Sequence, residues 1–124
     1  MSRLAELIAR NEGFGVPGSI PTVRNNPGDL RHSPHSSHPD GPNDIGTIDT
    51  EAHGWEDLEG QLQRYAADGY TLSEMVNVYL GFPKDAPLDE SIVDGNNRVS
   101  YLNSICEGLG LPPETPVSQA LEVT

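Results

Sequence analysis

The chain has 124 residues and a mass of 13.4 kDa, a size at which one domain over residues 1–124 is expected. Its formal net charge is −12, from 19 acidic residues against 7 Lys and Arg, whereas nucleic-acid binding requires clustered positive charge. Apolar stretches are shorter than the roughly 20 residues of a membrane-spanning helix, and charged residues interrupt the N-terminal segment where a secretory signal would be apolar. We therefore expect a folded domain that binds neither nucleic acid nor membranes.

The first predicted helix covers residues 2–12. Ser2 is suited to cap its start, and Gly13 is suited to the left-handed conformation that ends a helix. The spacing of the following residues places them on one face: Leu4, Leu7, Ile8 and Asn11. Glu12 lies in the final turn and flanks this face, whereas Glu6 points further from it.

A long irregular region, residues 15–37, follows this helix and contains several Pro and Gly turn signals. Residues 32–44 consist of polar residues, Pro and Gly, so we expect a mobile loop that is dispensable for folding and can close as a flap. Residues 45–49 predict a short strand that forms half of a small hairpin.

Four further helices are predicted in the rest of the chain. Thr50 caps the first of them, residues 51–68, in which Trp55 is expected in the core against the N-terminal helix. A capping box at residues 71–74 opens the next helix, which ends before Gly81, and a Pro-containing connection is expected over residues 82–94. The last two cover residues 96–109 and a tail that starts at Thr115-Pro116, with Thr115 as cap. The fold class is thus mainly α, with about five helices and a small β element near residues 45–49.

Glu12 is the first candidate for chemistry. It sits beside apolar residues at the helix end where the dipole is negative, and both features favour the protonated carboxyl that a general acid requires. The segment Asn25-Asn26-Pro27-Gly28 is a turn whose two amides can donate to and accept from sugar hydroxyls.

The order of these segments resembles the lysozyme-like, lytic-transglycosylase-type domains of phage virion proteins and endolysins. The similarity extends from about Leu4 to Pro116, and its most specific part is the Asn-Asn-Pro-Gly turn. The matching segments are Glu12-Gly13-Phe14, Asn25 to Arg31, Thr50 to Trp55, Gly69 to Leu72, Tyr79, Asn97 to Tyr101, and Gly110.

This resemblance implies a lysozyme-like fold, a peptidoglycan glycan strand as substrate, and Glu12 as the acid that protonates the glycosidic oxygen. It also implies a substrate cleft lined by Asn25, Asn26, Tyr79 and Tyr101, and we add Asp29 and Arg31 as substrate-binding candidates. A lysozyme needs a second carboxylate, for which Asp29, Asp44 and Asp49 are candidates, whereas a lytic transglycosylase does not. Two other classes stay open: a non-catalytic virion-structural or wall-binding module of the same fold, and a small protein with a basic partner.

The remaining expectations concern ions, partners and location. Arg24 and Arg31 flank the turn and are expected to pair with Asp29 or to contact substrate carboxylates. The cluster of His32, His35, His38 and Asp40 lacks the spacing of a structural zinc site, so we expect no metal and no cofactor. We expect a location in a phage virion, with other virion proteins as neighbours, or in the host cytoplasm with release to the cell wall by another route.

Overall fold

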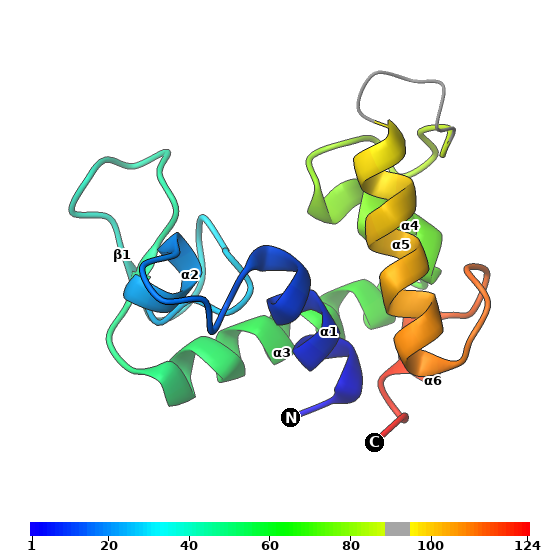
Figure 1. Ribbon diagram of the computed structural model, residues 1–124, viewed down its shortest axis with the longest axis horizontal. Coiled ribbons are helices and arrows are strands. Elements are labelled where there is room, and N and C mark those ends of the chain that lie inside the picture. Colours follow the sequence, from blue (N-terminus) through cyan, green and yellow to red (C-terminus); the bar gives the residue numbers. More distant parts are fainter. Residues whose placement is uncertain (89–94) are drawn as a thin grey trace. The chain divides into compact units, whose positions relative to one another are not determined.

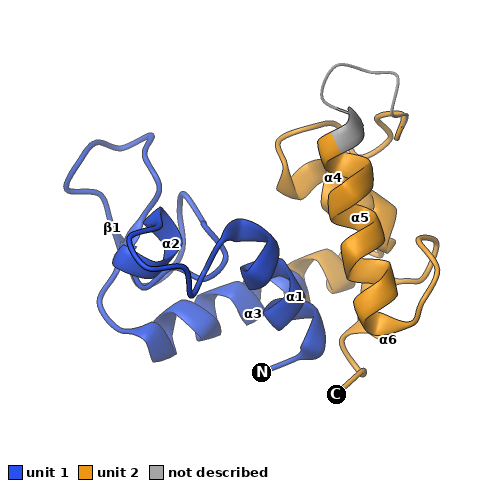
Figure 2. Ribbon diagram, in the orientation of Figure 1, with its two compact units in different colours: residues 1–62 blue, residues 63–124 orange. Residues whose placement is uncertain are grey.

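The computed structural model describes residues 1–88 and 95–124, which form two compact units, residues 1–62 and 63–124 (Figures 1 and 2). Six helices and one two-stranded antiparallel sheet lie in these described residues. The prediction of a mainly helical chain with a small β element is confirmed, whereas the single domain over residues 1–124 stays a prediction. None of the described helices combines the length and apolar character needed to cross a membrane.

Helix α1 (Arg3–Glu12) begins the first unit, with both ends as predicted. The Ser2 hydroxyl accepts a hydrogen bond from the Ala5 amide (3.1 Å), and Gly13 ends the helix at φ 89°. The buried face comprises Leu4, Ala5, Leu7, Ile8 and Ala9. Asn11 is exposed and donates its amide hydrogen to the Leu7 carbonyl (2.9 Å), so the buried face stops short of this residue.

Helix α2 (Ile20–Val23) lies within the stretch predicted as irregular. The sheet joins β1 (Ser36–Ser37) to β2 (Thr47–Ile48), with Ser36 opposite Ile48. The predicted strand is therefore half of a hairpin, as expected, and Ile48 anchors it with 1% of its surface exposed.

Helix α3 (Glu51–Ala67) begins in the first unit and ends in the second. The Thr50 hydroxyl accepts a hydrogen bond from the His53 amide (3.1 Å), as a capping residue does. Leu58 and Leu62 are fully buried. Trp55 is only partly buried and meets Phe14 edge to face, with ring centroids 5.4 Å apart, so it lies at the margin of the core.

The second unit contains α4 (Leu72–Tyr79), α5 (Gly95–Leu109) and α6 (Val117–Ala120), and α4 packs on both of the others (Figure 1). The predicted capping box of Thr71 and Glu74 is present. Thr115 does not cap the tail helix: its carbonyl accepts a hydrogen bond from the Leu72 amide (3.0 Å), and Pro116 takes the capping position. Of the predicted connection at residues 82–94, the part after residue 88 lies outside the described residues.

The Asn-Asn-Pro-Gly turn rests directly on α3 at Gly54. A β-carbon at Gly54 would lie 2.1 Å from the Asn25 carbonyl oxygen and 2.8 Å from the Pro27 ring. A contact this close with backbone is possible only because glycine has no side chain. The helix and the turn therefore fix each other's positions.

Gly54→Ala is expected to lower the free energy of unfolding by about 2 kcal/mol or more, because the new methyl group forces the turn off the helix. Gly60, in the same helix, has open space around its α-carbon, so Gly60→Ala is the matched control. Its helix propensity should raise stability by up to about 1 kcal/mol. Urea denaturation of both variants checks the prediction, and an equal gain in both would show that the turn does not touch α3.

Candidate functional site

Glu12 is the last residue of α1 and is partly buried. The backbone directly after it is hydrogen-bonded to the start of α2: the Ser19 hydroxyl donates to the Gly13 carbonyl (2.8 Å), and the Gly15 amide donates to the Thr22 hydroxyl (2.8 Å). The Ser19 and Thr22 hydroxyls also bond to each other (2.8 Å). The end of the helix that carries Glu12 is thus fastened to the segment that leads into the turn.

Asn26 is the centre of that turn and has no exposed surface. Its side-chain amide donates to the carbonyls of Leu30 and Gly46 (2.8 Å each), and its side-chain oxygen accepts from the Leu30 amide (3.0 Å). Its backbone amide donates to the Pro21 carbonyl (2.8 Å). In this conformation Asn26 supports the turn from inside and presents no atom to a substrate.

Asn25 and Asp29, at either end of the turn, both have a positive φ, 52° and 53°. Asn and Asp tolerate this conformation better than most residues. Asn25 is partly exposed, and its side chain donates to the Ile48 carbonyl (3.2 Å), which ties the turn to β2. Its remaining polar capacity and its exposure are compatible with a contact to substrate.

Asp29 is a partly buried carboxylate, and its Oδ1 atom is buried without a hydrogen-bond partner among the described residues. Burial raises the pKa of Asp29, and the charges of Arg31 and Arg24 only partly oppose this. The expected pairing of these arginines with Asp29 is not made. Arg24 instead pairs with Asp40 (3.0 Å) and Asp44 (3.5 Å), and Arg31, which is exposed, donates to the Asn43 carbonyl.

The three candidates for a second carboxylate now differ. The Ile45 amide and Arg24 lower the pKa of Asp44, which is held in these contacts. A hydrogen bond from His53 lowers the pKa of the exposed Asp49. Among the three, only Asp29 has a buried carboxylate oxygen that lacks a hydrogen-bond partner in the described chain.

The two tyrosines that were predicted to line the substrate cleft belong to the second unit. Tyr79 ends α4 and is partly exposed, with its ring centroid 6.4 Å from that of Tyr65. Tyr101 lies in α5 and is 8% exposed.

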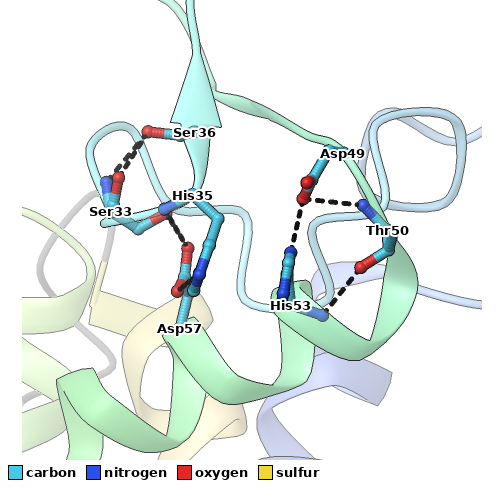
Figure 3. A network of polar contacts seen from close by, with 7 residues as sticks. All are labelled: Ser33, His35, Ser36, Asp49, Thr50, His53 and Asp57. Carbon is cyan, nitrogen blue, oxygen red and sulfur yellow. Dashed lines mark hydrogen bonds and ion pairs between the residues drawn. The ribbon is translucent and has the colours of Figure 1, made fainter.

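A polar network that sequence reasoning missed surrounds Asp57, which is 3% exposed (Figure 3). Its carboxylate accepts hydrogen bonds from the Ser33 hydroxyl (2.6 Å), the His35 amide (2.9 Å) and the His35 ring nitrogen Nδ1 (2.6 Å). Burial alone would raise the pKa of Asp57, but these hydrogen bonds lower it. The hydrogen bond between the His35 ring and the Asp57 carboxylate raises the pKa of His35.

His53 lies beside this network. Its Nδ1 atom contacts the Asp49 carboxylate (2.8 Å), and its ring stacks on that of His35 with centroids 3.9 Å apart (Figure 3). The sequence does hold a signal: His53, Glu56 and Asp57 follow the i, i+3, i+4 spacing of one helix face. It gave no indication that His35 would meet that face.

The segment of residues 32–44 is therefore not the loosely held loop that was expected. Ser33 and His35 bond to buried Asp57, His38 bonds to the Arg31 carbonyl, and Asp40 pairs with Arg24. The histidine cluster considered from sequence is also divided: His32 and His38 contact each other, with centroids 4.7 Å apart, whereas His35 faces His53.

No protein-family model, curated protein or solved structure matches this chain.

Asp29→Asn is expected to stabilise the protein at pH 7, raising the melting temperature by a few degrees. The folded-state pKa lies above the unfolded value of 3.8, so ionised Asp29 opposes folding at neutral pH, and this cost disappears as pH falls below both values. Melting curves from pH 7 to pH 3 should show the gain shrinking with acidification. Asp85→Asn, at an exposed position, is the charge-matched control; an equal gain there would contradict the account.

Asp57→Ala is expected to lower the free energy of unfolding by about 3 kcal/mol, because it removes the buried acceptor of three hydrogen bonds and leaves the donors of Ser33 and His35 without that partner. Asp49→Ala removes the exposed carboxylate beside the other histidine and should cost less than about 1 kcal/mol. Urea denaturation measures both. Similar small losses would mean that the segment around Ser33 and His35 is dispensable after all.

Proposed function

We propose that this protein cleaves the glycan strands of peptidoglycan and that Glu12 is the general acid. The observation that carries the proposal is the hydrogen-bonded connection between the end of α1 and the turn at residues 25–29. It holds an acid and a set of amide and carboxylate groups on one framework. Uncharged, hydroxyl-rich sugars are recognised by groups of this kind.

The position of Glu12 suits proton donation. Glu12 is partly buried in the last turn of α1, where the negative end of the helix dipole disfavours an added negative charge. A neutral carboxyl can deliver its proton to the glycosidic oxygen while the sugar ring develops oxocarbenium character.

The turn would contribute binding and a second carboxylate. We assign substrate contact to Asn25, Asp29 and Arg31, and we assign Asn26 the role of holding them in place. If water is the nucleophile, Asp29 is the preferred second carboxylate, because Asp44 and Asp49 are engaged elsewhere. If the substrate's own hydroxyl attacks, Glu12 acts first as acid and then as base, and the product carries an anhydro end.

One observation favours the alternative of a non-catalytic module of virion or cell wall. The net charge of −12 opposes encounter with an anionic polymer such as an intact wall. A non-catalytic virion-structural module of the same fold, which need not approach the wall, would tolerate this charge.

Glu12→Gln distinguishes these possibilities, because it keeps the shape of the side chain but cannot donate the proton. Turnover on purified peptidoglycan, followed by release of soluble fragments, is expected to fall by about 100-fold or more. The melting temperature should stay equal or rise slightly. Glu6→Gln, an exposed position in the same helix, is the matched control and should retain activity.

Each other outcome has a definite meaning. A wild-type protein without turnover between pH 4 and pH 8 supports the non-catalytic alternative. An active wild type with an equally active Glu12→Gln variant shows that the acid lies elsewhere. Mass spectrometry of the products separates hydrolysis from transglycosylation by the anhydro end.

A further inference from the structure

The stacked rings of His35 and His53 have nitrogen atoms that could bind a metal ion and that the proposed function does not use. Their rings are almost parallel, 9° apart, and each Nδ1 atom contacts a carboxylate: Asp57 for His35 (2.6 Å) and Asp49 for His53 (2.8 Å) (Figure 3). Ionised carboxylates only accept hydrogen bonds, so each Nδ1 carries the hydrogen and each Nε2 keeps a lone pair in the neutral ring. Among the described residues, neither Nε2 atom has a hydrogen-bond partner.

Glu56 offers a third possible metal ligand, on the same face of α3 as His53. Glu56 is exposed, three residues after His53 in α3, and one donor atom from each of His35, His53 and Glu56 lies within 4.8 Å of the others. Zinc binds nitrogen and oxygen at about 2.0–2.2 Å, so the donors must approach one another by on the order of an ångström. The two rings are nearly parallel, so their lone pairs do not converge as they stand. Binding therefore requires the partly exposed rings to turn toward each other, together with rotation of the exposed Glu56 side chain.

We propose that His35, His53 and Glu56 form a binding site for a divalent transition-metal ion, Zn²⁺ in particular. Two imidazoles and one carboxylate are a donor set that zinc favours, and they leave a position open to water. Asp57 and Asp49 act as positioning residues, since a carboxylate on the second ring nitrogen fixes the tautomer and orientation of a metal-binding histidine. This site is distinct from the one that contains Glu12.

The ion would connect two parts of the first unit. His35 immediately precedes β1, whereas His53 and Glu56 belong to α3. Binding at all three therefore fastens the segment before the hairpin to the helix, adding to the hydrogen bonds at Asp57. An ion that binds only the folded form raises stability according to its concentration and affinity.

The test is a zinc titration of chelator-treated, metal-free protein by calorimetry, together with melting curves and the visible absorption of bound Co²⁺. We expect one Zn²⁺ per chain, a higher melting temperature with Zn²⁺ than with Mg²⁺, and Co²⁺ absorption typical of fewer than six ligands. His53→Gln and Glu56→Gln, both at the surface of α3, should weaken zinc binding by at least about 10-fold without unfolding the protein.

Two further sets of variants decide whether the proposed residues are responsible. Asp49→Asn should weaken zinc binding by about 10-fold through the orientation of His53, while the melting temperature of the metal-free protein stays unchanged. His32→Ala and His38→Ala remove the other histidine pair and should leave the affinity unchanged. Zinc binding that depends on His32 or His38 but survives His53→Gln and Glu56→Gln overturns the proposal, as does a wild type that binds no zinc.

Discussion

The first unit depends on one buried amide. Asn26 places a polar side chain where water cannot reach it, a position that is costly unless every donor and acceptor is satisfied. Its bonds to Leu30 and Gly46 satisfy them and close the turn onto the chain near β2. Because Gly54 lets the same turn rest on α3, a segment rich in Pro, Gly and polar residues becomes a defined platform.

Because Asn26 and Gly54 fix this turn, Asp29 can be held in a partly buried position that disfavours its charged form. Its carboxylate is partly buried, its Oδ1 lacks a partner in the described chain, and Arg24 is directed to Asp40 and Asp44 instead. Perturbed carboxyl groups are common in catalytic sites. The Asp57 network shows the opposite case, a buried carboxylate whose bonds to Ser33 and His35 stabilise the local fold.

The features that could be predicted from sequence are those encoded by neighbouring residues. Ser2 and Gly13 mark the ends of α1, and the capping box of Thr71 and Glu74 starts α4, because capping needs only side chains within one turn. The contact of His35 with Asp57 and His53 joins residues about 20 positions apart, so no local pattern announces it. Residues 32–44 looked loosely held for the same reason, since their anchor lies on α3.

The candidate site also contains features that could be predicted from local sequence and features that depend on distant residues. Glu12 and the turn could be singled out because helix ends and turns have local signatures, whereas the division of roles within the turn could not. Asn26 is buried with its side chain bonded to the Gly46 carbonyl, whereas Asn25 is partly exposed and bonds to the Ile48 carbonyl. Both partners belong to the later hairpin segment, so the sequence of the turn alone could not assign these roles. Likewise, Arg24 pairs with Asp40 and Asp44 because the segment of residues 32–44 folds back beside Arg24, which no local pattern predicts.

The proposed function requires that the end of α1 and the turn together bind a glycan strand. The most direct measurement is a ¹H–¹⁵N NMR titration of the Glu12→Gln protein with a soluble peptidoglycan tetrasaccharide. If the proposed function is right, saturable shifts are expected for the backbone amides of Gly13, Phe14, Gly28, Asp29 and Arg31. Shifts confined to residues around His35 and His53, or none at saturating ligand, would contradict it.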